Sequence, residues 1–298
     1  MAQGTTRLWT RETFNLDECF VNLPDECVRE FDTFLNGSAV RFTAIKDLMA
    51  RIRDLLVHGQ GMAIIQNMPV ERYSVRDNGG IGRLLSAQLG QVVAQTWTGT
   101  TVYDVKDTGK ELGEGVRRSQ TNLGQPFHTD GGFLFYPPQF VGLLCLEQAA
   151  DGGDSDLVSL AHAHKIAVKE LVWRLGLPFY WHRQREHILG EVPASSYPVF
   201  EKTDPCGLVV RWYEDYIING YKVVGKTLDE SGHEALEFLR HILDAERSWV
   251  RFRLQKGSFQ FVNNWELAHR RTAYEKGSFR HLLRFWTRTK GLWTLEGF

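Results

Sequence analysis

Cysteine is scarce in this chain, and neither sign of charge dominates. The formal net charge of the 298 residues is −1, which removes any general electrostatic attraction to nucleic acid or to an anionic membrane surface. No two cysteines have Cys-x-x-Cys spacing, and a reduced, cytoplasmic protein is favoured; the cysteines are Cys19, Cys27, Cys145 and Cys206. We therefore expect a small-molecule partner and neither a nucleic acid nor a membrane.

Long hydrophobic runs are also absent. No uninterrupted apolar run approaches the about 18 residues that a membrane-spanning helix needs. Residues 1–9 contain no apolar segment of the kind found in secretory signals, which again favours the cytoplasm. The sequence leaves open whether the protein forms a homo-oligomer.

The chain does contain many short segments with strand-like alternation or apolar runs. They predict strands at residues 61–66, 101–105, 140–146, 156–160, 249–254, 257–262 and 281–287. Helical periodicity predicts helices at residues 25–35, 42–57, 78–89, 161–175 and 229–247. Residues 197–218 are expected to form short aromatic strands and turns.

This order of elements predicts an α+β, mainly β fold. Its core would be a double-stranded β-helix (a jelly roll, cupin-like) flanked by helices. We expect a single domain over residues 1–298, with a helical N-terminal part at about 1–95 and the jelly-roll core at about 96–290. An insertion of helices and strands at about 161–247 would interrupt that core.

His128 and Asp130 are the first residues that point to chemistry. They are two positions apart, so on an extended backbone they face the same side. An imidazole and a carboxylate so placed supply two thirds of the facial triad that binds non-heme Fe(II) and leaves open positions for chemistry. His269 is the third candidate ligand, expected where a loop leaves the sheet after residues 257–262.

Two arginines follow His269 at a spacing that indicates an anion-binding site. Arg280 and Arg284 are an even number of residues apart, so on one strand they share a face. A guanidinium that points into an apolar barrel is costly unless it meets an anion, and a carboxylate can accept paired hydrogen bonds from it. Arg117 and Arg118 lie in a long polar loop, residues 106–125, of the kind that covers active sites; we expect their own side chains to be solvated.

Four motifs together resemble the taurine-dioxygenase-like family of Fe(II)/2-oxoglutarate oxygenases, which includes γ-butyrobetaine hydroxylase and clavaminate synthase. The motifs are His128-x-Asp130, Gly152-Gly153-Asp154-Ser155, Asn263-Asn264 through His269, and the Arg280–Trp286 segment. The resemblance covers about residues 120–290. It implies Fe(II), 2-oxoglutarate as cosubstrate and O2.

The resemblance also assigns roles to residues of this chain. His128, Asp130 and His269 would be the iron ligands. Arg280 would pair with the distal carboxylate of 2-oxoglutarate, helped by the hydroxyl of Ser155. Arg284 would lie at the iron end, near the first carboxylate of the cosubstrate or an anion of the substrate.

The expected reaction is hydroxylation, or desaturation, of an unactivated C–H bond in a small polar or anionic metabolite, with release of succinate and CO2. Asp130 occupies the coordination place that a halide would need, so halogenation is disfavoured. One alternative is an iron oxidase of the same fold that does not use 2-oxoglutarate, against which Arg280 and Ser155 argue. The other is a non-catalytic binding protein, which would have no reason to retain all three metal ligands and both anion-binding groups. Trp286 is expected to be an ordinary core residue.

Overall fold

The computed structural model describes residues 7–39, 41–113, 115–203 and 207–289. Its α-helices are α1 Asp25–Leu35, α2 Ala44–Val57, α3 Val75–Leu89, α4 Leu160–Ile166, α5 Lys169–Leu175, α6 Glu214–Val223 and α7 Glu230–Asp244. Its strands are β1 Phe20–Asn22, β2 Met62–Gln66, β3 Gln91–Val93, β4 Tyr103–Lys106, β5 Gln125–His128, β6 Phe140–Glu147, β7 Ser155–Ser159, β8 Pro178–His182, β9 Ala194–Pro198, β10 Phe200–Thr203, β11 Gly207–Val210, β12 Trp249–Phe252, β13 Phe259–Asn263, β14 Leu267–Arg271 and β15 His281–Arg288.

Two sheets form the centre of the molecule. The larger has the order β1-β2-β13-β6-β15-β3, with β4 also paired to β15, and the smaller has the order β12-β7-β14-β5. The two sheets face each other across a shared apolar core, to which Val141 and Leu282 contribute from the larger sheet and Leu157 and Leu267 from the smaller. Neighbours in these sheets are far apart in sequence, as in a jelly roll. The predicted double-stranded β-helix with flanking helices is confirmed.

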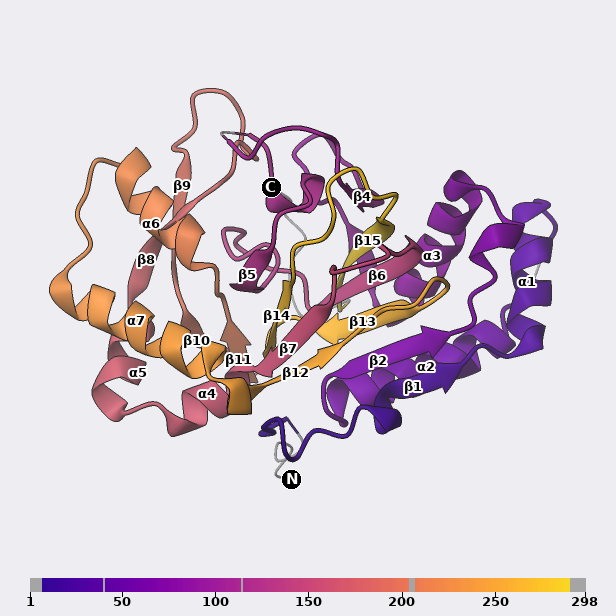
Figure 1. Ribbon diagram of the computed structural model, residues 1–298, viewed down its shortest axis with the longest axis horizontal. Coiled ribbons are helices and arrows are strands. Elements are labelled where there is room, and N and C mark those ends of the chain that lie inside the picture. The colour runs from indigo at the N-terminus through magenta and orange to yellow at the C-terminus, as the bar shows by residue number, and fades with distance from the viewer. Residues whose placement is uncertain (1–6, 40, 114, 204–206, 290–298) are drawn as a thin grey trace.

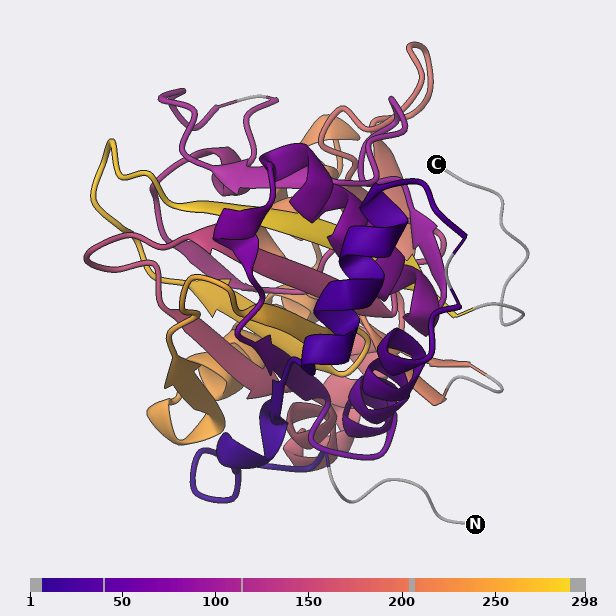
Figure 2. The same cartoon turned by 90° about the vertical axis from the view of Figure 1, so that its right-hand side faces the viewer.

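Helices α1, α2 and α3 cover the outer face of the larger sheet (Figures 1 and 2). Both faces of the larger sheet are buried, as strand β15 shows. Its residues Leu283 and Phe285 pack in the core under these helices. Leu282 and Trp286 belong to the core between the two sheets. The contact with α3 is close, because a methyl group at Gly82 would overlap the ring of Phe285. Even-numbered side chains of β15 therefore face the interior of the barrel.

Between β7 and β12 the chain forms a separate layer of helices and two small hairpin sheets, on the left of Figure 1. Two expectations fail here. The helix predicted at 161–175 is two helices, because the backbone is extended at Ala167 and Val168. The strands and turns predicted at 197–218 give way to helix α6 from Glu214 onward, where acidic residues in the first turn favour a helix start.

The described cysteines, Cys19, Cys27 and Cys145, are free and buried, and Cys206 lies outside the described residues. Burial raises the pKa of the Cys145 thiol to about 12, which makes this cysteine a poor nucleophile. Within the described residues no helix is both long enough and apolar enough to span a bilayer.

Candidate metal centre

Strand pairing in the smaller sheet places two histidines side by side. His128 ends β5, His269 lies in the middle of β14, and the two are direct partners in the antiparallel register. The expectation that His269 sits in a loop leaving the sheet is therefore wrong, because residues 267–271 pair with both β5 and β7. Pairing fixes the His269 backbone more firmly than a loop would.

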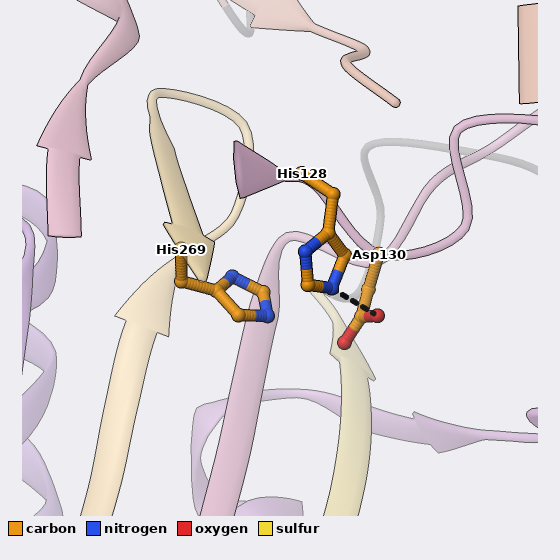
Figure 3. A group of neighbouring side chains, drawn as sticks. All are labelled: His128, Asp130 and His269. Atoms are coloured by element: carbon orange, nitrogen blue, oxygen red, sulfur yellow. Dashed lines mark ion pairs between the residues drawn. The ribbon is translucent and has the colours of Figure 1, made fainter. Parts of the chain in front are cut away.

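The third member of this group, Asp130, follows β5 by two residues. The nitrogen and oxygen atoms that His128, Asp130 and His269 can offer to a metal lie within 4.8 Å of one another. Figure 3 shows the three side chains converging, with His128 Nε2 3.8 Å from Asp130 Oδ1. Two imidazoles and one carboxylate on one side of a small space fit the facial triad of a non-heme Fe(II) centre.

Both histidines have lowered pKa values and are therefore uncharged, which is the state in which histidine binds a metal. Burial, together with the nearby His269, lowers the pKa of His128 to about 3, and burial likewise lowers the pKa of His269. His128 Nδ1 is 2.9 Å from the carbonyl oxygen of Pro126, so it carries the proton and leaves the Nε2 lone pair free for a metal. The side-chain amide of Gln125 lies 2.9 Å from that Nε2.

Asp130 is held from both its backbone and its side chain. The fully buried Asn264 accepts a hydrogen bond from the Asp130 amide at 2.7 Å and donates one to the Asp130 carbonyl at 3.0 Å. Arg284 Nη1 donates to Oδ1 and Trp286 Nε1 to Oδ2, each at 3.0 Å. Burial opposes ionisation of Asp130, but Arg284 and the two histidines keep its pKa below the ordinary value. The carboxylate is thus charged and fixed in orientation.

Trp286 and Arg284 therefore have more specific surroundings than the sequence indicated. Trp286 is buried, as predicted, but its indole also contacts a candidate ligand directly. The Arg284 guanidinium is tied to Asp130 and to the side chain of Gln95. Both arrangements follow from the inward-facing, even positions of β15.

Trp286→Phe is expected to weaken metal binding about tenfold, because loss of a group that orients a metal ligand typically costs 10–100-fold. The phenyl ring fills most of the same space but leaves Asp130 Oδ2 without its donor. The measurement is the Co(II) or Fe(II) dissociation constant under anaerobic conditions. Trp9→Phe is the matched control, because Trp9 is buried and donates to the carbonyl of Gln60, outside the candidate site. Equal affinity in Trp286→Phe and wild type would contradict the role of the indole.

A cavity adjoins the two histidines and is lined by Ser155, Arg280 and Arg284 among others. Arg280 is 3% exposed, donates from Nε to Gln148 at 2.9 Å, and has an Nη1 atom without a hydrogen-bond partner. Gly153 adopts φ +73°, and a Cβ there would lie 2.8 Å from Arg280 Nε. The double glycine thus lets the arginine enter the cavity beside Ser155.

A second pocket lies on the other side of His128 and Asp130, and Arg117 and Arg118 line it. The expectation that these two arginines are solvated is wrong. Arg117 forms a buried ion pair with Glu186, and Arg118 donates to the Gly124 carbonyl at 3.0 Å. The ion pair with Glu186 connects the 106–125 loop to the segment that follows β8.

Residues 35–286 match the family described as "Taurine catabolism dioxygenase TauD, TfdA family". The chain belongs to this family. It is therefore a non-heme Fe(II)/2-oxoglutarate dioxygenase whose cofactor set is Fe(II), 2-oxoglutarate and O2, as the sequence resemblance implied.

This TauD/TfdA dioxygenase has a characterised relative and several structural neighbours. It is 30% identical over 266 residues to the FR-33289 synthase of Streptomyces rubellomurinus (strain ATCC 31215), with 85% of this chain and 76% of the relative covered. Asparagine oxygenase, solved with Fe(II), a 3-hydroxyasparagine and succinate, has the same fold: the TM-score is 0.67 at 19% identity, over 91% of this chain and 94% of the other. The oxygenase OrfP, solved with Fe and alpha-ketoglutaric acid, gives 0.66 at 16% identity, over 92% and 95%.

Several residues around the dioxygenase site were not found from the sequence. Gln95 reaches it from an irregular segment after β3, and Gln125 from the first position of β5. Tyr213 and Tyr216 stack at 4.0 Å between ring centroids, and the Tyr213 ring is 5.0 Å from that of His128. They belong to the segment in which helix α6 was missed. Tyrosines three residues apart at a helix start would have been the only available signal.

Proposed function

We propose that this dioxygenase hydroxylates, or desaturates, an unactivated C–H bond of a small polar or anionic metabolite. In this proposal His128, Asp130 and His269 bind Fe(II), and Arg280 and Ser155 bind the distal carboxylate of 2-oxoglutarate. The observation that carries it is a buried, convergent ligand group beside a cavity that contains an arginine nitrogen without a partner. An iron oxidase that does not use 2-oxoglutarate would have no need for that arginine.

The residues divide the work between binding and orientation. Fe(II) held there would activate O2 against the 2-oxoacid, so that one oxygen atom enters the substrate and the other enters succinate, with loss of CO2. The two neutral imidazoles add no charge, and Asp130 offsets part of the metal charge. Arg284 and Trp286 keep the Asp130 carboxylate oriented, which makes Arg284 a positioning residue in addition to any contact with the cosubstrate.

The substrate would occupy the second pocket, under the 106–125 loop. Stacked Tyr213 and Tyr216 form one wall, and Arg118 lies at the edge. Around the site, positive charge from Fe(II), Arg280 and Arg284, with that of the buried Arg271, exceeds the negative charge of Asp130 and a dianionic cosubstrate. A substrate with an anionic group would reduce this excess in a region of low dielectric constant.

Similar proteins support a substrate of amino-acid size. Asparagine oxygenase was solved with a hydroxylated asparagine, and OrfP with (3S)-hydroxy-L-Arg. Both compounds carry a carboxylate next to polar groups, as the arginine-edged pocket would require. We infer that small amino acids and related acids are the first substrates to try, before betaines and sulfonates.

The test is a turnover screen with Fe(II)-loaded protein, O2 and 2-oxoglutarate. Succinate formation is measured with each candidate metabolite and without one, and the product of any active compound is analysed for a mass gain of one oxygen or a loss of two hydrogens. Each acid is paired with its amide or ester as a neutral control. Substrate-dependent succinate is expected only with the anionic member of a pair. Failure of the protein to bind 2-oxoglutarate at all would reject the proposed function.

A further inference from the structure

Arg271 is a third buried arginine at the proposed cosubstrate cavity, beside Arg280 and Arg284. We propose that Arg271 binds the distal carboxylate of 2-oxoglutarate together with Arg280. This inference rests on the proposed function, because it assumes that 2-oxoglutarate occupies this cavity. It adds a residue from another strand to the anion site and links that site to the 106–125 loop.

The strand register places Arg271 where such a contact requires it. Arg271 is the direct partner of Ser155 in the pairing of β14 with β7, and directly opposed residues in an antiparallel pair project from the same face. His269 lies two residues earlier and shares that face. Arg271, Ser155, His269 and Arg280 all line the same cavity. His269, a candidate iron ligand, and Arg271 thus lie two positions apart on β14, opposite Ser155 on β7.

The Arg271 guanidinium lacks a negative partner. The residue is 8% exposed, and its Nε is buried without a hydrogen-bond partner. Nη2 donates to the carbonyl oxygens of Thr121, at 3.1 Å, and Leu123. Among the described residues no carboxylate lies within ion-pair distance of Arg271. Carbonyl oxygens satisfy hydrogens but do not neutralise the charge, and a buried charge of this kind is costly until an anion arrives.

Arg280 likewise has no carboxylate partner among the described residues, and the two arginines are close neighbours. Both guanidinium groups lie over the ring of Tyr274, with centroid distances of 4.8 Å for Arg271 and 5.3 Å for Arg280. Burial, together with the charge of Arg271, lowers the pKa of Arg280 to about 10. Two like charges in one cavity repel each other, so a carboxylate between them is stabilised by both. If Arg280 alone bound the carboxylate, a second buried guanidinium beside it would have no purpose.

The Arg271 side chain also contacts the 106–125 loop. Nε has no hydrogen-bond partner, whereas Nη2 donates to the carbonyl oxygens of residues 121 and 123, just before β5, which carries Gln125 and His128. Binding of the distal carboxylate would therefore fix Arg271 and, through it, the segment that leads to the first iron ligand.

The experiment compares two 2-oxoacids in the Fe(II)-loaded, anaerobic protein. 2-Oxoglutarate and 2-oxovalerate have the same chain length, but 2-oxovalerate ends in a methyl group in place of the distal carboxylate. Dissociation constants are measured by titration of the metal-to-ligand charge-transfer absorption for wild type, Arg271→Met and Arg280→Met. Arg240→Met is the control, because Arg240 is paired with Glu214 on the surface.

We expect Arg271→Met to weaken 2-oxoglutarate binding about tenfold or more and to leave 2-oxovalerate binding unchanged. A purely structural role for Arg271 would weaken both ligands equally, and that result would overturn the proposal. So would unchanged affinity for both. If wild-type protein and Arg280→Met bind the two 2-oxoacids equally well, the proposed function itself fails, since no group would then select the distal carboxylate.

Discussion

Replacement of His128, Asp130 or His269 by alanine is expected to abolish turnover in each case. Each residue would supply one of only three protein ligands, and the donor atoms lie within 4.8 Å of one another in a buried site. Removal of a group that merely orients a ligand typically weakens metal binding 10–100-fold, so loss of the ligand itself should cost more than about 100-fold. The measurements are the Fe(II) dissociation constant and substrate-dependent succinate formation.

Two variants make this prediction specific. His162→Ala removes a histidine of helix α4 that is not part of the group, and it should keep wild-type metal affinity. Asp130→Gly removes the carboxylate and should lose oxygenation. If oxygenation survived intact, another carboxylate would have to bind the metal. Asp154 is poorly placed for that task, because it is paired with Arg253 at 2.8 Å.

Arg280→Ala is expected to weaken 2-oxoglutarate binding by about one to two orders of magnitude. The guanidinium is 3% exposed and holds an unpartnered nitrogen in the cavity beside Ser155. A hydrogen bond to a charged group contributes about 1.5–3 kcal/mol, and a planar guanidinium can make two of them to one carboxylate. Fe(II) affinity should change little, since Arg280 is not a ligand.

Two related variants are expected to lose less affinity for 2-oxoglutarate than Arg280→Ala. Arg280→Lys should recover only part of the affinity, because an ammonium keeps the charge but not the planar geometry. Ser155→Ala should have the mildest effect, the loss of a single hydroxyl contact. The measurement is the anaerobic 2-oxoglutarate titration of Fe(II)-loaded protein. An unchanged constant in Arg280→Ala would remove this residue from the cosubstrate site.

Local sequence patterns were sufficient for much of the fold. Helices with a clear apolar stripe, such as α1, and strands with apolar runs, such as β6, appear where periodicity predicted them. The breaks at Ala167 and Val168 were not predictable, because their residue types are compatible with a continuous helix and tertiary packing decides the backbone. Helix α6 was missed for the opposite reason: its tyrosines and isoleucines also favour strands.

In the candidate site, too, local sequence patterns predicted some features, whereas others depend on tertiary structure. The spacing of His128 and Asp130 is local, and a two-residue rule identified it. The pairing of His128 with His269 joins residues distant in sequence, and the register between Ser155 and Arg271 does the same. No local rule supplies such a register. The hydrogen bond from Trp286 to Asp130 likewise requires the relative position of the two sheets.

The close contact of Gly82 with Phe285 limits which sequences this fold can tolerate. Helix α3 contributes no residue to either pocket described above, yet it presses on the outer side of the strand whose inner side carries Arg284 and Trp286. A larger residue at position 82 would require a shift of the Phe285 ring, or of the helix and strand that carry these two residues. Substitutions in the helical layer can therefore disturb the strand that carries Arg284 and Trp286, and the matched family region includes α2 and α3. Redesign of the proposed substrate pocket would disturb this contact less through the 106–125 loop than through the sheet.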